Sequence, residues 1–188
     1  MMPKFLVLAV VAGLLILALA ALMLDPAPTM RNLAGASGVG QSISDGPSVI
    51  YSAKFPDAWG QSQTLAQWDR RLLVINFWAT WCGPCKEEMP ILKKLQADFG
   101  GSGLQIVGIA ADTQSNVANF GKNIGINYPL LVAETDAIDI SRRMGNRLGL
   151  LPHTLVLKPG GQIIYAKLGP VSESELAAII TKNLPIGN

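Results

Sequence analysis

The feature that most constrains this chain is a Cys-x-x-Cys motif close behind a continuous run of apolar residues. Residues 71–78 (RLLVINFW) are typical of a strand buried on both faces of a sheet. The motif Trp81-Cys82-Gly83-Pro84-Cys85 follows, and residues 83–99 have a helical pattern that a glycine cluster at 100–103 ends. The motif is therefore expected where a buried strand leads into a helix.

The composition of the chain favours redox chemistry at this motif. Cys82 and Cys85 are the only cysteines and His153 is the only histidine, so the chain cannot supply the roughly four ligands of a zinc site from these residue types. A structural disulfide across so short a loop would remove little entropy from the unfolded chain. At the N-terminus of a helix, free N–H groups and the helix dipole would stabilise a Cys82 thiolate. Cys82 is thus the predicted attacking sulfur and Cys85 the resolving one, while Pro84 fits the first helical turn.

The remaining elements alternate in a way that indicates an α/β fold. The first strand, the helix and a second buried strand at 104–110 form a unit that favours parallel strands and a right-handed crossover. A final helix at 172–183 opens with a Ser-x-x-Glu capping box. The other predicted elements are helices at 115–124 and 138–148 and strands at 154–157 and 162–167. We predict a mixed central sheet flanked by helices.

The N-terminal residues 1–24 form a separate segment. Residues 5–24 are apolar without interruption, and as a helix they would reach roughly 30 Å, the thickness of a bilayer's hydrocarbon core. One N-terminal transmembrane helix is the prediction, and a signal peptide cleaved after Ala18-Leu19-Ala20 is the alternative. Both interpretations export the rest of the chain. Lys4 before the span favours a cytoplasmic N-terminus.

Composition divides residues 25–188 into a linker and a folded domain. Residues 25–48 are rich in Pro, Gly, Ala, Ser and Asn, which predicts a flexible linker, and residues 49–188 would form one domain. The chain has 15 basic and 13 acidic side chains, and its longest basic clusters are pairs such as Arg142 and Arg143. This nearly neutral balance argues against nucleic acid as a partner.

The chain resembles the thioredoxin-like, membrane-anchored thiol-disulfide oxidoreductases of the TlpA and ResA type. The resemblance extends from about Val49 to Asn183, and its most specific stretch is VINFWATWCGPCKEEMP at residues 74–90. It implies a thioredoxin fold on the outer face of a bacterial cytoplasmic membrane, with residues 115–148 as an extra segment of this branch. It also implies that Pro152 is a cis-proline facing the two cysteines and exposing the backbone of Leu151 for pairing with a client. A trans-proline that only starts a strand is the alternative.

Glu88 is the third predicted catalytic residue. It shares one helix face with Leu92, Leu95 and Phe99, so its carboxyl should be partly buried with a raised pKa, and it could exchange a proton with Cys85. The resembled branch has a glutamate at this point with a similar proposed role. A surface glutamate that only borders the apolar face is the alternative, and Glu87 should be solvated.

Other residues near the motif have separate predicted roles. Thioredoxin has a buried aspartate where this chain has Asn76, which cannot relay a proton, so that task would fall to Glu88 or water. His153 is expected on the rim of the site, as an exposed or partner-contacting side chain or, alternatively, as a participant in proton transfer. Trp81 should cover the disulfide and contact partners together with Gly83 and Pro84, whereas Trp78 should pack in the core.

The sequence therefore predicts an envelope thiol-disulfide oxidoreductase whose only redox group is the Cys82–Cys85 disulfide, with no other cofactor and no metal. The Gly-Pro pair between the cysteines is that of thioredoxin, which favours reduction of exported protein disulfides. A transmembrane thiol carrier would supply the electrons, and the resemblance suggests apocytochrome c as a client. One alternative is an oxidant or isomerase, and another is a non-catalytic domain that holds client proteins. A third is a thiol peroxidase, but the Pro-x-x-x-Thr-x-x-Cys pattern that such an enzyme would need is missing.

Overall fold

A five-stranded mixed sheet organises the computed structural model, which describes residues 50–184. The strand order is β5-β4-β3-β6-β7, with β5, β4 and β3 parallel and β6 and β7 each antiparallel to its preceding neighbour. The strands are β3 (Leu72–Trp78), β4 (Leu104–Ala110), β5 (Leu130–Val132), β6 (His153–Leu157) and β7 (Ile163–Leu168). The predicted mixed sheet is confirmed.

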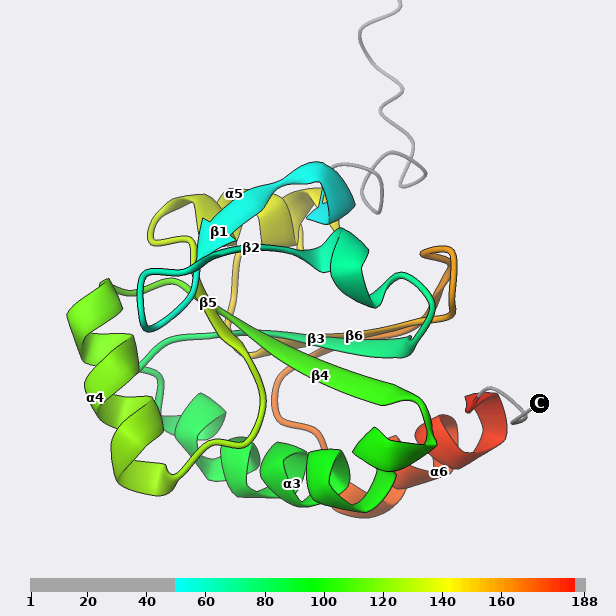
Figure 1. The fold of residues 1–188 in the computed structure, drawn as a ribbon. Helices are drawn as coiled ribbons and strands as arrows, with labels where there is room; N and C mark the ends of the chain where they lie inside the picture. The colour runs from blue at the N-terminus through cyan, green and yellow to red at the C-terminus, as the bar shows by residue number, and fades with distance from the viewer. Residues whose placement is uncertain (1–49, 185–188) are drawn as a thin grey trace, which may run out of the picture. The chain divides into compact units, whose positions relative to one another are not determined.

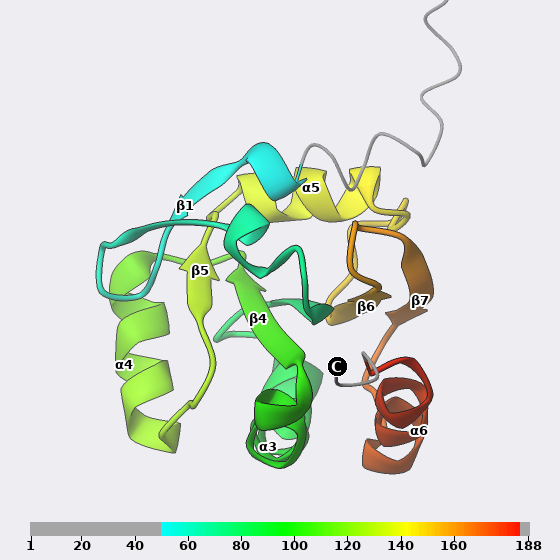
Figure 2. The ribbon, with the colours of Figure 1, turned by 45° about the vertical axis from the view of Figure 1, so that its right-hand side comes forward.

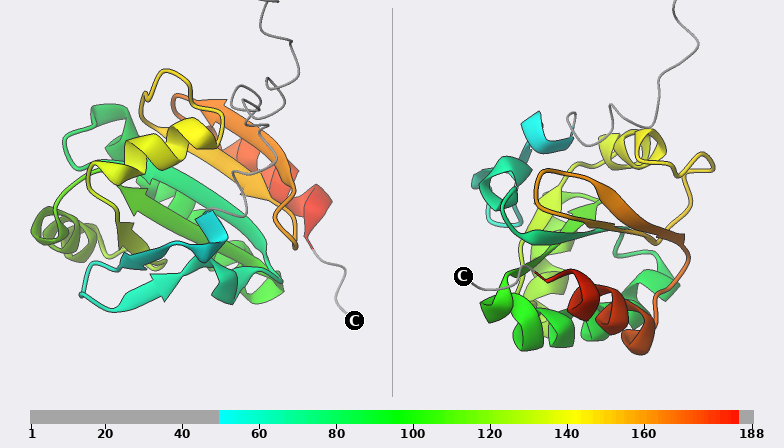
Figure 3. Two further views of the ribbon diagram at one scale, coloured as in Figure 1. Left: turned by 90° about the horizontal axis from the view of Figure 1, so that it is seen from above. Right: turned by 90° about the vertical axis from the view of Figure 1, so that its right-hand side faces the viewer.

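Helices cover both faces of this sheet (Figure 1). On one face, α3 (Gly83–Phe99) and α6 (Glu173–Asn183) lie side by side, as Figure 2 shows. On the other face lie α5 (Asp136–Arg143) and a two-stranded hairpin of β1 (Lys54–Pro56) and β2 (Ser62–Thr64) (Figure 3). The helix α4 (Gln114–Ile124) precedes the edge strand β5.

The central β3-α3-β4 unit matches its sequence prediction closely. Every residue of β3 is buried, because the strand has helices or the hairpin on both sides. Alternate residues point to opposite faces, so Leu72 and Val74 join the core under α3 while Leu73 and Ile75 join the core under α5. Two hydrophobic cores thus hold β3 in place, and its last residue, Trp78, is fixed close to the motif.

The later elements agree with the predictions except at α5 and in the short strands. The helix α5 covers residues 136–143, whereas the sequence predicted 138–148, because Gly145 adopts a φ of 105° and ends the helix early. Three strands of three residues each, β1, β2 and β5, were not predicted. Ser172 caps α6 by accepting a hydrogen bond from the Glu175 N–H, as expected. The Glu175 carboxylate also accepts hydrogen bonds from Lys167 and Tyr165, and together with a backbone hydrogen bond from Ser172 these lower its pKa.

The predicted membrane anchor at 1–24 and linker at 25–48 lie outside the described residues. Within residues 50–184, no helix combines the length and the apolar character that a membrane crossing requires. Both segments therefore stay predictions.

Candidate active site

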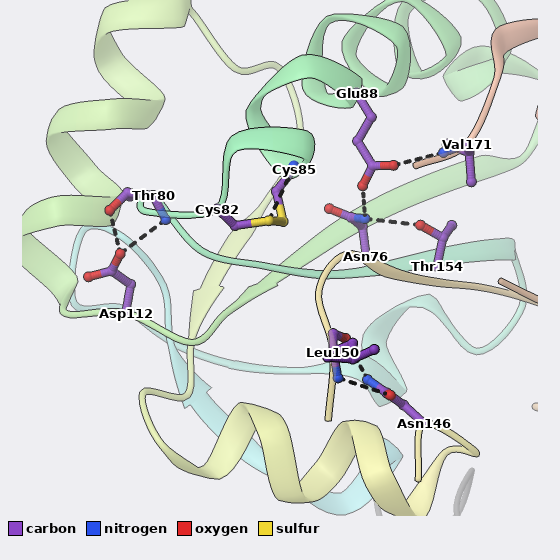
Figure 4. The surroundings of a disulfide bond; sticks show 10 residues. All are labelled: Asn76, Thr80, Cys82, Cys85, Glu88, Asp112, Asn146, Leu150, Thr154 and Val171. Carbon is purple, nitrogen blue, oxygen red and sulfur yellow. Dashed lines mark hydrogen bonds between the residues drawn. A yellow bond between two sulfur atoms is a disulfide. The ribbon is translucent and has the colours of Figure 1, made fainter. Parts of the chain in front are cut away.

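Cys82 and Cys85 form a disulfide at the point where β3 gives way to α3 (Figure 4). Cys82 is the N-cap of α3, and its Sγ accepts a hydrogen bond of 3.2 Å from the backbone N–H of Cys85. Pro84 lies in the first helical turn, where its missing N–H leaves no intrahelical bond unmade. Cys82 is 6% exposed and Cys85 is fully buried. Only Cys82 therefore combines a helix N-terminus with an opening to solvent, as its predicted role requires.

The surface around the disulfide is formed by exposed residues of the motif. Trp81 is 68% exposed, and Gly83 and Pro84 are exposed as well. Trp78 is buried and packs against Phe120, with ring centroids 5.3 Å apart. The predicted division between a surface tryptophan and a core tryptophan is confirmed.

The Leu151–Pro152 peptide bond is cis, as predicted. Pro152 is buried and Leu151 is half-buried, and the pair comes immediately before β6. Phe77 of β3 is paired with His153 of β6, so Pro152 lies at the same end of the sheet as the start of the motif. The antiparallel pairing of β3 and β6 therefore brings the cis-proline loop and the disulfide to the same end of the sheet.

A pocket with a volume of about 350 Å³ opens beside Trp81. Its other walls come from the residues directly after β4 and from residues before and within the first turn of α5, the latter belonging to the extra segment predicted at 115–148. They are formed by Ala111, Asp112, Thr113, Glu134, Thr135 and Ile138. The extra segment thus contributes directly to the surroundings of the motif.

Glu88 is 1% exposed, so the prediction of a buried carboxyl on α3 is confirmed. Its Oε1 accepts a 2.6 Å hydrogen bond from Asn76 Nδ2, and its Oε2 accepts a 3.0 Å bond from the backbone N–H of Val171. Burial raises the pKa of Glu88, although these two hydrogen bonds and the charge of Lys167 counteract part of the effect. The carboxyl is therefore suited to hold a proton at higher pH than an exposed glutamate. Glu87 is exposed, as predicted.

Asn76 connects Glu88 to the neighbouring strand. Its Nδ2 also donates to Thr154 Oγ1 at 3.0 Å, and Asn76 and Thr154 are directly paired across β3 and β6. Among the described residues, Asn76 Oδ1 has no hydrogen-bond partner. Asn76 thus positions the carboxyl on which the proton chemistry would depend.

His153 does not lie on the rim, so the expectation of an exposed side chain is wrong. It is 2% exposed, stacks on Phe77 with ring centroids 5.7 Å apart, and bonds through Nδ1 to Ser141 Oγ at 2.9 Å. Burial lowers the pKa of His153 to about 4, so the ring is neutral near pH 7. The error arose because sequence adjacency to Pro152 was taken as a position on the surface.

The structure adds Asp112, a residue that the sequence analysis missed. Its carboxylate accepts from both the backbone N–H and the hydroxyl of Thr80, and from Thr113 N–H and Asn116 Nδ2 at 2.8 Å each. Burial alone would raise the pKa of Asp112, but these bonds together lower it. Because Thr80 lies two residues before Cys82, Asp112 fixes the loop that carries the motif. Its position at the end of a buried strand was the available signal.

The sheet, the disulfide at a helix N-terminus and the cis-proline at the same edge define a thioredoxin-like thiol-disulfide oxidoreductase of the TlpA/ResA type. Residues 26–180 match the Redoxin family, and the chain belongs to it.

Curated relatives of the chain are named as thiol-disulfide oxidoreductases. The chain is 29% identical over 136 residues to "Thiol-disulfide oxidoreductase ResA" of Bacillus subtilis (strain 168), a match that covers 70% of this chain and 69% of the relative. It is 28% identical over 116 residues to the protein of that name from Bacillus anthracis, where coverage is 60% of this chain and 64% of the relative. The chain thus spans about two thirds of the length of these relatives.

Solved structures show the same fold. A thiol:disulfide interchange protein of the thioredoxin family from Chlorobium tepidum TLS superposes with a TM-score of 0.63 and 27% identity, covering 71% of this chain and 93% of that one. A DsbF homologue from Corynebacterium diphtheriae, 23% identical, gives a TM-score of 0.63 over 71% of this chain and 85% of its own. The second likeness concerns the fold alone.

Proposed function

We propose that the protein reduces disulfides in exported proteins. The thiolate of Cys82 attacks one sulfur of a client disulfide, a mixed disulfide forms, and the other client sulfur leaves as a thiolate that takes up a proton. Cys85 then loses its proton and attacks the Cys82 sulfur, which releases the second client thiol. Two electrons pass to the client, and the enzyme is left with the Cys82–Cys85 disulfide and needs no further cofactor.

The observation that carries this proposal is the asymmetry of the two sulfurs. Cys82 is the helix N-cap and retains an opening to solvent, whereas Cys85 is closed off inside α3. An attacking thiol needs access and a stabilised thiolate, and a resolving thiol needs only to reach its partner.

Glu88 supplies the proton step in this scheme. Residues three apart on a helix are neighbours, so Glu88 and Cys85 share one buried face of α3. In its ionised form it can take the Cys85 proton before the resolving attack, and it can return that proton when the disulfide is reduced again. The raised pKa of Glu88 brings the group nearer to neutral pH, where such an exchange is efficient.

Clients would bind along the rim of the site. The backbone of Leu151 pairs with an extended client segment, while Trp81, Gly83 and Pro84 contact the residues next to the attacked disulfide. These roles agree with the exposure of the three motif residues and with the position of the cis-proline loop at the same edge.

The location proposed is the extracytoplasmic side of the bacterial cytoplasmic membrane, with residues 1–24 as a single-pass anchor. A reductant in that oxidising space requires electrons from inside the cell, so a transmembrane thiol carrier is the proposed donor. Apocytochrome c is the proposed client on the basis of the resemblance to the ResA type.

The reduction potential of the Cys82–Cys85 couple tests the direction of electron flow. Equilibration with defined thiol buffers, read by the alkylated fraction, should give a value near thioredoxin's, about −270 mV. A value near DsbA's, about −120 mV, would assign the protein to the oxidants instead.

A further inference from the structure

Asn146 binds both backbone polar groups of Leu150, in the loop that leads to the cis-proline. Its Nδ2 donates to the Leu150 carbonyl oxygen at 2.7 Å, and its Oδ1 accepts from the Leu150 N–H at 3.2 Å (Figure 4). The Asn146 side chain is fully buried. One amide group therefore fixes the peptide units on both sides of Leu150.

Asn146 is itself held by a further hydrogen bond, to α5. Its Nδ2 also donates to Ser141 Oγ at 2.9 Å, and Ser141 in α5 bonds to the ring of His153 at the start of β6. The His153 ring stacks on Phe77 of β3. A buried chain of contacts therefore connects the loop to β3, the strand that leads into the Cys82–Cys85 motif.

The backbone groups of the neighbours Leu150 and Leu151 differ in their hydrogen bonds. Both groups of Leu150 are occupied by Asn146, whereas in the described part of the chain no backbone hydrogen bond involves the N–H or C=O of Leu151. The side chain of Leu150 is 55% exposed, so the loop presents an apolar surface as well. Leu151, directly before the cis-proline, thus has backbone groups that are free to pair with a client.

We propose that Asn146 is a positioning residue for client binding, which holds the loop so that the Leu151 backbone meets an extended client beside Cys82. The proposal rests on the disulfide reductase function above. A loop without this clamp would have to be ordered when the client binds, and that lost conformational freedom would weaken binding. The effect should therefore depend on whether the substrate has a peptide backbone.

Two substrates of the reduced protein distinguish a role in positioning peptide clients from a general effect on disulfide reduction. The first is a synthetic peptide with an internal disulfide, and the second is bis(2-hydroxyethyl) disulfide, which has no peptide backbone. For Asn146→Ala, we expect the second-order rate constant to fall about tenfold with the peptide, which corresponds to about one net hydrogen bond. With the small disulfide it should stay within about twofold.

Arg143→Ala is the matched control, because Arg143 is an exposed residue of α5 close to Asn146 in the chain. Both of its rate constants should equal those of the wild type. Equal losses of Asn146→Ala with both substrates, or no loss with either, would overturn the positioning role. A wild-type protein that reduces neither substrate would instead refute the reductase function.

A measurement on the wild type keeps the proposal testable if Asn146→Ala does not fold. Amide hydrogen exchange of the free protein should show a protected Leu150 and a rapidly exchanging Leu151. A non-reducible peptide analogue of the client should then slow the exchange of Leu151. A Leu150 amide that exchanges freely, or a Leu151 amide already protected without peptide, would contradict the inference.

Discussion

Replacing Glu88 with glutamine removes a titrating proton from the site and keeps the size of the side chain. The wild-type carboxyl accepts two hydrogen bonds, from Asn76 and from the Val171 N–H. Glutamine has one acceptor oxygen, which can serve Val171, and one NH2 group, which donates. Because Asn76 Oδ1 has no partner among the described residues, rotation of the Asn76 amide lets it accept from the new side chain. We therefore expect Glu88→Gln to fold, with a change in unfolding free energy of about 1 kcal/mol.

The magnitude of the effect on the cysteines is set by the helical spacing. Side chains three residues apart on a helix are about 6 Å apart. At that distance and an effective dielectric constant of about 20, two unit charges interact by about 3 kcal/mol, which corresponds to a difference of about two in pKa. Loss of the ionised Glu88 should thus lower the pKa of Cys85 by up to about two. Loss of the proton acceptor should slow resolution of the mixed disulfide by about a hundredfold.

The pKa of Cys85 is measured from thiolate absorbance against pH. The rate at which the mixed disulfide is resolved is measured by stopped-flow reduction of a peptide disulfide. Glu87→Gln is the control, because Glu87 is the exposed neighbour on the same helix and its replacement should leave both unchanged. Thiolate supply and turnover should move in opposite directions in Glu88→Gln, which general unfolding would not produce. If both quantities match the wild type, Glu88 has no part in the proton step.

The stability of Glu88→Gln relative to the wild type should also increase as the pH rises above about 4.5. Since burial raises the pKa of Glu88, the folded protein holds this proton to higher pH than the unfolded chain, whose carboxyl titrates near 4.5. Wild-type stability should therefore fall as the pH rises from about 4.5 through the folded pKa, by about 1.4 kcal/mol for each pH unit that separates the unfolded from the folded pKa. The glutamine variant lacks this loss. The unfolding free energy of the variant, measured with urea, should therefore rise relative to that of the wild type over the same pH range.

Three further outcomes test the assigned roles. Iodoacetamide should alkylate Cys82 of the reduced protein at least about tenfold faster than Cys85, as mass spectrometry of the separate peptides would show; equal rates would reverse the assignment. Cys85→Ala should trap clients as mixed disulfides on non-reducing gels, and trapping by Cys82→Ala in its place would contradict the scheme. Asp112→Asn should lose about 1–3 kcal/mol of unfolding free energy at pH 7. Because hydrogen bonds lower the folded pKa of Asp112 below 3.8, that difference should shrink as the pH falls through this range, and a difference independent of pH would refute the ionised-acceptor role.

The parts of the fold that could be predicted from sequence are those with local signals. The strand β3 is a continuous apolar run, and α3 begins at a motif with a proline in its first turn and ends at a glycine cluster. The burial of Glu88 is predictable from helical periodicity alone. Its second hydrogen bond comes from Val171, 83 residues away in the chain, and no local pattern indicates such a partner.

The prediction for His153 failed although the sequence contains the relevant pattern. His153, Leu155 and Leu157 alternate along β6, and the two leucines lie in the core under α5. Residues two apart in a strand share a face, so the histidine should have been placed in that core. The strands β1, β2 and β5 are different, because three residues are too few to show an alternation.

The register of β3 against β6 connects the two halves of the site. Asn76 pairs with Thr154 and Phe77 pairs with His153, and adjacent positions in a strand point to opposite faces. The first pair supports Glu88 under α3, where the cysteine proton would be handled. The second pair supports, through Ser141, the Asn146 that holds the cis-proline loop. A slip of one residue would turn both pairs to the wrong faces, so one strand pairing determines the geometry of both the proposed proton transfer and the proposed client binding.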